Sequence, residues 1–124
     1  MNKHDLNERL IDFAVMIIGI TDAMPNTKAG NHLAGQLVRS GTSPSLNYGE
    51  AQSGESRSDF VHKIKIVLKE LRETMNALKI IGKANMFKNG EFLSKAIKEN
   101  NELISIFVKS VETAQKNNSD KKSR

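Results

Sequence analysis

The chain has 124 residues, no cysteine and a formal net charge of +5, from 19 Lys and Arg against 14 Asp and Glu. This length suits one domain with a hydrophobic core and is too short to divide comfortably into two. Without cysteine the chain has neither a disulfide framework nor a thiolate metal site, which fits a cytoplasmic protein. The apolar run from Phe13 to Ile20 is too short to span a bilayer, so we expect no membrane association.

The first predicted helix runs from about Leu6 to Ala23. Asp5 with Glu8 three residues later is typical of a capping box, and apolar residues then repeat at helical spacing until Pro25. Three further apolar residues lie off the main stripe, namely Ile11, Val15 and Ile18. The helix is therefore apolar around most of its circumference, more than its neighbours within one bundle need, and we expect the surplus to be buried against another subunit.

A second predicted helix follows the turn at Pro25, with Thr27 as its N-cap. Gly41 and Pro44 interrupt its apolar pattern. Because proline inside a helix removes a donor and clashes with the carbonyl four residues back, we expect a kink or a short break around Ser40 to Ser43. The alternative is two short helices.

The third predicted helix runs from Asp59 to about Ile81, with Ser58 as its N-cap. After a short connection, Asn89 or Gly90 opens a last helix that ends near Gln115. No strand-like alternation competes with this helical pattern. The sequence therefore predicts an all-α fold, an up-down-up-down antiparallel four-helix bundle with a kinked second helix.

The polar C-terminus predicts a division into a bundle domain, residues 1–115, and a basic, disordered tail, residues 116–124. The last ten residues hold four cations and one carboxylate, so they carry +3 of the total charge. The rest of the chain is only weakly basic. Attraction of an anionic partner therefore depends on where the cations lie.

The third helix carries a basic stripe opposite its apolar side. At about 100° per residue these positions fall within an arc of about 100° that contains no carboxylate. They are His62, Lys65, Lys69, Arg72, Asn76, Lys79 and Lys83. One interpretation is an ordinary solvated face, although such a face usually mixes both signs of charge. The other is a surface for an anionic partner, which the separation of sign favours.

The sequence offers no metal site, cofactor site or catalytic residues. A di-iron bundle needs a Glu-x-x-His pair on each of two helices, and the single near match, Asp59-Phe-Val-His62, lies at a helix start where Asp59 favours the helix dipole. The other histidines, His4 and His32, lie in separate segments. No Walker loop is present. We therefore expect a protein that is not an enzyme.

Residues Arg39 to Ser43 have two interpretations. Glycine can let backbone N–H groups converge on an anion, and Arg39 would add a planar guanidinium. More often, a glycine with hydroxyls beside a proline marks a helix kink or a close contact between helices. The sequence favours the second interpretation.

Residues of the second and third helices resemble a known family. These are Gln36 to Ser43, Asn47 to Ala51, Ser56, Asp59-Phe60, Lys63, Lys69-Glu70 and Arg72-Glu73-Thr74. The pattern is similar to that of small bacterial four-helix bundle proteins related to those encoded in ribosomal RNA intervening sequences. The resemblance covers Leu6 to about Ile81 and fades over the last helix.

The resemblance implies a left-handed up-down bundle. Such proteins are similar to accessory proteins of diversity-generating retroelements, which form barrel-shaped pentamers and associate with nucleic acid and a reverse transcriptase. Several positions match the family pattern, and most are expected to maintain the kink or the subunit contacts. They are Arg39, Gly41, Thr42, Ser43, Asn47, Glu50, Asp59, Phe60, Lys63, Glu70 and Glu73, with Pro44 between them at the expected kink.

The sequence thus predicts a non-enzymatic homo-oligomer, a pentamer by resemblance, that binds RNA or DNA with low specificity through phosphates. The cations expected to make these contacts are Lys65, Lys69, Arg72, Lys79, Lys83 and those of the tail. The alternative is an adaptor or scaffold ring that docks a protein partner, which the weak charge of the body favours. Whether the stripe faces solvent or another subunit stays open at this stage.

Overall fold

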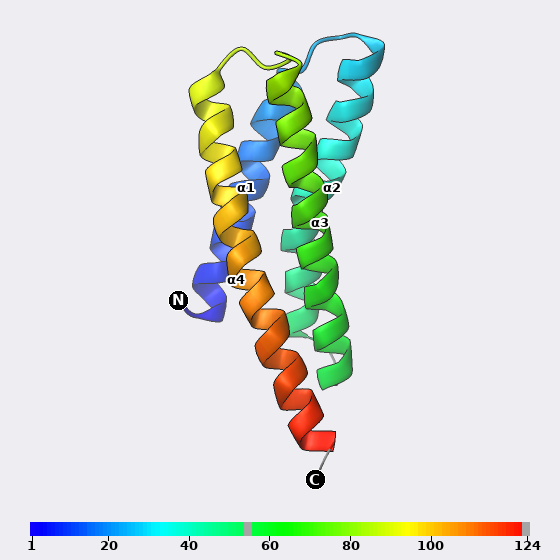
Figure 1. Cartoon of the computed structure of the whole chain (residues 1–124), viewed down its shortest axis with the longest axis vertical. Helices are drawn as coiled ribbons and strands as arrows, with labels where there is room; N and C mark the ends of the chain where they lie inside the picture. The colour runs from blue at the N-terminus through cyan, green and yellow to red at the C-terminus, as the bar shows by residue number, and fades with distance from the viewer. Residues whose placement is uncertain (54–55, 123–124) are drawn as a thin grey trace.

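The structure is a computed structural model that describes residues 1–53 and 56–122, with side chains as far as residue 117. It contains four helices: α1 (Lys3–Asp22), α2 (Lys28–Gln52), α3 (Arg57–Lys83) and α4 (Gly90–Lys122). Successive helices run in opposite directions, as Figure 1 shows. The predicted all-α, up-down-up-down bundle is confirmed.

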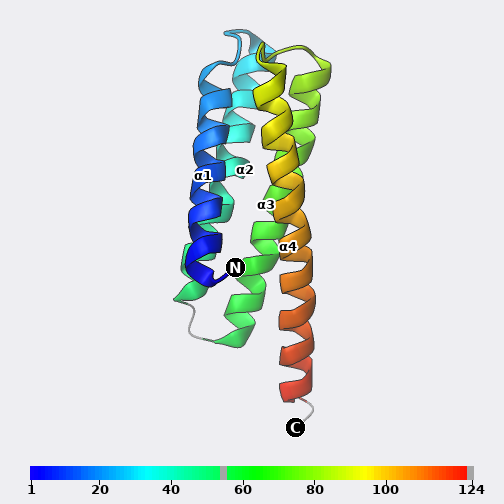
Figure 2. The ribbon, with the colours of Figure 1, turned by 90° about the vertical axis from the view of Figure 1, so that its left-hand side faces the viewer.

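Each helix packs against the next one along the chain, and α4 closes the bundle against α1 with the sparsest contact. In Figure 1 α3 and α4 lie in front of α1 and α2, and the view from the side in Figure 2 separates the same two layers. The bundle therefore has two broad faces on opposite sides. One is formed by α1 and α2, and the other by α3 and α4.

Side-chain caps start the helices, and two of the predicted starts are wrong. Thr27 caps α2 as predicted, accepting a hydrogen bond from Gly30 N at 3.0 Å. In α1 the capping box joins Asn2 and Asp5, so this helix begins before Leu6. In α3 the cap is Ser56, which accepts from Asp59 N at 3.1 Å, and the first turn includes the residue predicted as the cap.

The helix α4 is longer than predicted. The side chain of Asn89 accepts a hydrogen bond from Phe92 N at 3.0 Å and caps its start. The helix then continues to Lys122, so the predicted end near Gln115 is too early. In both figures α4 reaches beyond the lower ends of the other helices. Of the residues predicted as a disordered tail, 116–122 continue the helix, and 123–124 lie outside the described residues.

The helix α2 runs without interruption through Pro44, so the alternative of two short helices is wrong. Proline removes the N–H that would bond to the Ser40 carbonyl, and the bend expected from this loss stays a prediction. Nearby side chains bond within the helix: Thr42 Oγ1 donates to Val38 O at 2.7 Å, and Asn47 Nδ2 donates to Ser43 O at 3.0 Å.

The connection from α3 to α4 is a tight turn with Asn85 in the left-handed region, at φ 55°. Met86 N donates to Ile81 O at 3.0 Å, and Asn85 N donates to Gly82 O at 3.2 Å. This pair of bonds is the Schellman arrangement, which ends a helix and reverses the chain. This turn sets α4 antiparallel to α3, so that the two helices lie side by side.

The core runs the length of the bundle and contains apolar side chains of all four helices. Those with no exposed surface include Phe13, Ile17, Leu37, Leu71, Leu78 and Phe107. Close to its centre α1 and α2 approach each other at Gly41. A Cβ placed on Gly41 would lie 2.5 Å from Ile17 Cγ2. The glycine is required here because no side chain fits between the two helices.

We expect Gly41→Ala to lower the free energy of unfolding by about 1–3 kcal/mol, because α1 and α2 have to separate to admit the methyl group. The matched control is Gly35→Ala in the same helix. A Cβ on Gly35 meets nothing within 4 Å. Because alanine has a better helix propensity than glycine, Gly35→Ala should raise the free energy of unfolding by up to about 1 kcal/mol. Chemical denaturation measures the free energy of unfolding of both variants. Equal gains in stability would contradict the close approach of α1 and α2 at Gly41.

Candidate nucleic-acid interface

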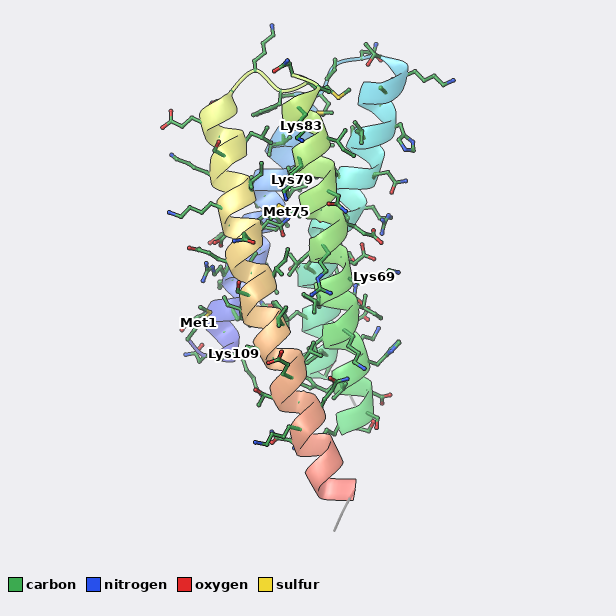
Figure 3. All side chains as sticks on the ribbon, in the orientation of Figure 1. Met1, Lys69, Met75, Lys79, Lys83 and Lys109 are labelled. Carbon is green, nitrogen blue, oxygen red and sulfur yellow. The ribbon has the colours of Figure 1, made fainter. Side chains whose placement is uncertain are left out.

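The predicted basic stripe lies on the outer surface of α3. The buried residues of this helix, including Ile64, Leu71 and Leu78, occupy its opposite side. All five predicted cations are exposed: Lys65, Lys69, Arg72, Lys79 and Lys83. Figure 3 shows Lys79 and Lys83 along the seam with α4, and Lys69 lower on α3. The helical spacing therefore placed the stripe correctly.

These five cations belong to none of the ion pairs within residues 1–53 and 56–117. The pairs in that part of the chain involve other cations, Arg9, Arg39 and Lys63. The stripe therefore keeps its positive charge on the surface of a single chain.

Arg39 of α2 binds two of the carboxylates of α3. Arg39 Nη1 lies 2.9 Å from Glu70 Oε2, and Nη2 lies 2.6 Å from Glu73 Oε2. This contact and its own burial make Glu70 part of the seam between α2 and α3. The Arg39 guanidinium holds the pKa of the Glu73 carboxyl below its ordinary value, and Lys69 adds a smaller effect.

The same seam contains further polar contacts between α2 and α3. Thr74 Oγ1 donates to Ser40 Oγ at 2.9 Å inside the core, and Lys63 forms an ion pair with Glu50. Several residues that carry the family resemblance thus lie at this seam, including Arg39, Glu50 and Glu70. Arg39 to Ser43 are part of the continuous helix α2, so the interpretation as an anion-binding turn is wrong.

The helix α4 extends the basic surface. A groove of about 400 Å³ lies between α3 and α4 and is lined by Met75, Lys79, Ser94, Ile97, Lys98, Asn101 and Ile104. Lys79 stands on one wall and Lys98 on the other. Lys98 is exposed, and it also belongs to no ion pair within residues 1–53 and 56–117.

Lys98 and the groove were not predicted from the sequence. Ser94, Lys98 and Asn101 follow helical spacing, which is visible in the sequence. Their position beside the stripe depends on the rotation of α4, which is set by the packing of Leu93 and Leu103 in the core. The pattern within one helix does not reveal that rotation.

The opposite face of the bundle exposes several large apolar side chains. On α1 the side chains of Ile11, Val15 and Ile18 are 38%, 61% and 43% exposed, and on α2 Leu46 is 67% exposed. The predicted surplus of apolar surface on the first helix is therefore present in the structure. The chain carries its basic groups and its exposed apolar groups mainly on different faces.

No group of three or more His, Asp or Glu side chains suited to a metal ion occurs among the residues that the structure describes. Within the same residues, no helix has the length and apolar character needed to cross a membrane.

Comparisons with known proteins agree with this architecture. The chain matches the 23S rRNA-intervening sequence protein family over residues 2–109. No curated protein matches it. A solved structure similar to this chain is a protein of unknown function from the S23 ribosomal protein family of Bacteroides thetaiotaomicron, at 26% identity and a TM-score of 0.78. That match covers 86% of this chain and 97% of the other.

We expect Arg39→Met to lower the free energy of unfolding at pH 7 by about 1–2 kcal/mol, because Glu70 loses its partner while it stays buried. In the folded protein the pKa of Glu73 lies below its ordinary value of 4.5. The ion pair of Glu73 with Arg39 therefore contributes fully to stability above the ordinary pKa. This contribution is lost as the pH falls through the pKa of the folded state. The difference between wild type and variant should therefore shrink in acid.

Denaturation at pH 7, 5 and 3.5 measures this difference. Lys28→Met serves as the control because Lys28 is exposed and forms no ion pair within residues 1–53 and 56–117. A difference that stays constant down to pH 3.5 would show that the stabilisation does not come from the ionised carboxylates.

Proposed function

The chain belongs to the 23S rRNA-intervening sequence protein family, and from that premise we propose that it is a cytoplasmic, non-enzymatic accessory protein that binds RNA or DNA. Binding is of low specificity and acts mainly through phosphates. The surface that makes these contacts is the basic face, defined as Lys65, Lys69, Arg72, Lys79 and Lys83 of α3 with Lys98 of α4.

All six cations of the basic face are exposed and belong to no ion pair within residues 1–53 and 56–117, and this is the main support for the proposal. A cation already paired with a carboxylate gains little from a phosphate, because the existing contact has to be broken first. Free cations along a helix instead displace the counterions of a polyanion, which favours binding and makes it dependent on salt.

The distribution of charge over the bundle also supports binding through the basic face. The outer side of α1 carries the carboxylates Glu8, Asp12 and Asp22, whereas the basic face lies on the far layer of the bundle. These carboxylates of α1 therefore repel a polyanion, and the cations of the basic face attract it. Such a charge distribution steers encounter toward the basic face even though the net charge is small.

The double variant Lys69→Glu/Lys79→Glu should bind structured RNA and duplex DNA about ten-fold or more weakly than wild type at about 100 mM salt. Its dependence of affinity on salt should also be shallower, by about one unit of slope for each lost cation. Fluorescence anisotropy at two or more salt concentrations measures both effects.

The matched control is Lys3→Glu/Lys28→Glu, which changes the net charge equally at exposed positions of α1 and α2. This control should keep most of the affinity. Equal losses in the two double variants would show that net charge, and not the basic face, governs binding.

The chain is also proposed to form a homo-oligomer through the apolar face, defined as Ile11, Val15, Ile18 and Leu46. Burying such side chains between subunits removes apolar surface from water without covering α3. Repeating the basic face in one assembly increases affinity for a long polyanion through avidity. The number of five subunits rests on the family resemblance alone.

We expect Val15→Gln to shift the protein toward monomers, because it places an amide in the centre of the apolar face. Ile80→Gln is the control, since Ile80 of α3 is 51% exposed but lies outside that face. Light scattering after gel filtration measures the mass of each variant. If Ile80→Gln dissociates the assembly and Val15→Gln does not, α3 is the interface and the basic face is covered.

A wild-type protein that stays monomeric would instead favour the second candidate function, the protein-interaction adaptor. The exposed apolar face supports this alternative, because such a face can dock a different protein as well as a copy of the chain.

A further inference from the structure

The groove between α3 and α4 combines an apolar floor with a polar rim. Its floor is formed by Met75, Ile97 and Ile104, of which Met75 is only 9% exposed. The rim consists of Lys79 on α3 and of Ser94, Lys98 and Asn101 on α4, all exposed. Figure 3 shows Met75 and Lys79 next to each other on the side of α3 that borders α4.

The polar groups of the rim are available to a ligand. The side chains of Ser94 and Asn101 form no hydrogen bond with other residues in the part of the chain that the structure describes. The two lysines approach from opposite walls and likewise belong to no ion pair there. A ligand over this groove would therefore meet two free cations, a hydroxyl and an amide above an apolar surface.

Phosphate contacts alone do not account for the apolar floor. A nucleotide, in contrast, has both matching parts: an anionic phosphate and a base with a broad face and hydrogen-bonding edges. The groove also lies within the basic face, since Lys79 belongs to both and Arg72 and Lys83 follow on either side along α3. A strand held by these cations would pass directly over it.

We propose that this groove receives an unpaired base of the bound nucleic-acid strand, an inference that rests on the proposed function. Lys79 and Lys98 contact the phosphates beside the base, Met75 and the two isoleucines contact its face, and Asn101 contacts its edge. A bulged base fits best, because it leaves the helical stack at less cost than a paired one. Since no aromatic side chain lines the groove, the preference is modest.

The test compares three RNA hairpins by fluorescence anisotropy with the full chain: one fully paired, one with a single bulged adenosine, and one with an abasic nucleotide at the bulge. The last two have the same number of phosphates, so their difference reports on the base alone. We expect the bulged adenosine to bind about five-fold tighter than the abasic nucleotide. A DNA hairpin with the same bulge should show the same preference. If only the RNA hairpin shows this preference, the occupant of the groove is an RNA base.

The variant Ser94→Leu fills the groove with an aliphatic side chain, without changing the charge and without adding an aromatic ring on which a base could stack. It should bring the affinity for the bulged RNA down to that for the abasic RNA and leave the affinity for the paired hairpin unchanged. Ser105→Leu is the control, because Ser105 is exposed on the same helix but does not line the groove. It should retain the preference.

Two results overturn the inference and differ in what they say about the proposed function. Equal, salt-dependent binding of all three hairpins, or a preference that survives Ser94→Leu, removes the groove as a base site and leaves phosphate binding intact. Absence of binding to every hairpin at low salt overturns both.

Discussion

The basic surface of this bundle depends on one contact, the pairing of Arg39 with Glu70 and Glu73. It joins α2 to α3, and it also holds the two carboxylates on the side of α3 that faces α2. If these carboxylates were not held there, they would be free to turn toward Lys69 and Arg72 and to neutralise them. The interaction that stabilises the seam between α2 and α3 is therefore the same one that leaves the outer side of α3 positively charged.

The packing of the bundle then assigns different chemistry to its two broad faces. Gly41 allows α1 and α2 to approach closely, and their outer surface exposes Val15 and Leu46. On the opposite face, the tight turn at Asn85 returns α4 beside α3, so that Lys98 stands across a groove from Lys79. An assembly formed through the first face leaves the second face open, and this arrangement removes the conflict between oligomerisation and binding to a polyanion.

The sequence predicted the four helices and the basic stripe because both depend on spacing within a single helix. It placed the starts of α1 and α3 wrongly, since several residues near each start can act as caps and only the structure shows that Asn2 and Ser56 do so. Pro44 also allowed the alternative of two short helices, which is wrong because α2 is continuous. Lys98 and the partners of Arg39 were not predictable, because they depend on how separate helices are rotated against each other.

The central claim is that the face of α3 and α4 is the one that meets a polyanion. Its most direct test is a titration of the isotope-labelled protein with a short RNA, followed by amide chemical shifts in two-dimensional NMR spectra. We expect the shift changes to concentrate between residues 65 and 83 and between residues 94 and 101. Changes concentrated on α1 and α2, or spread evenly over all four helices, would contradict it.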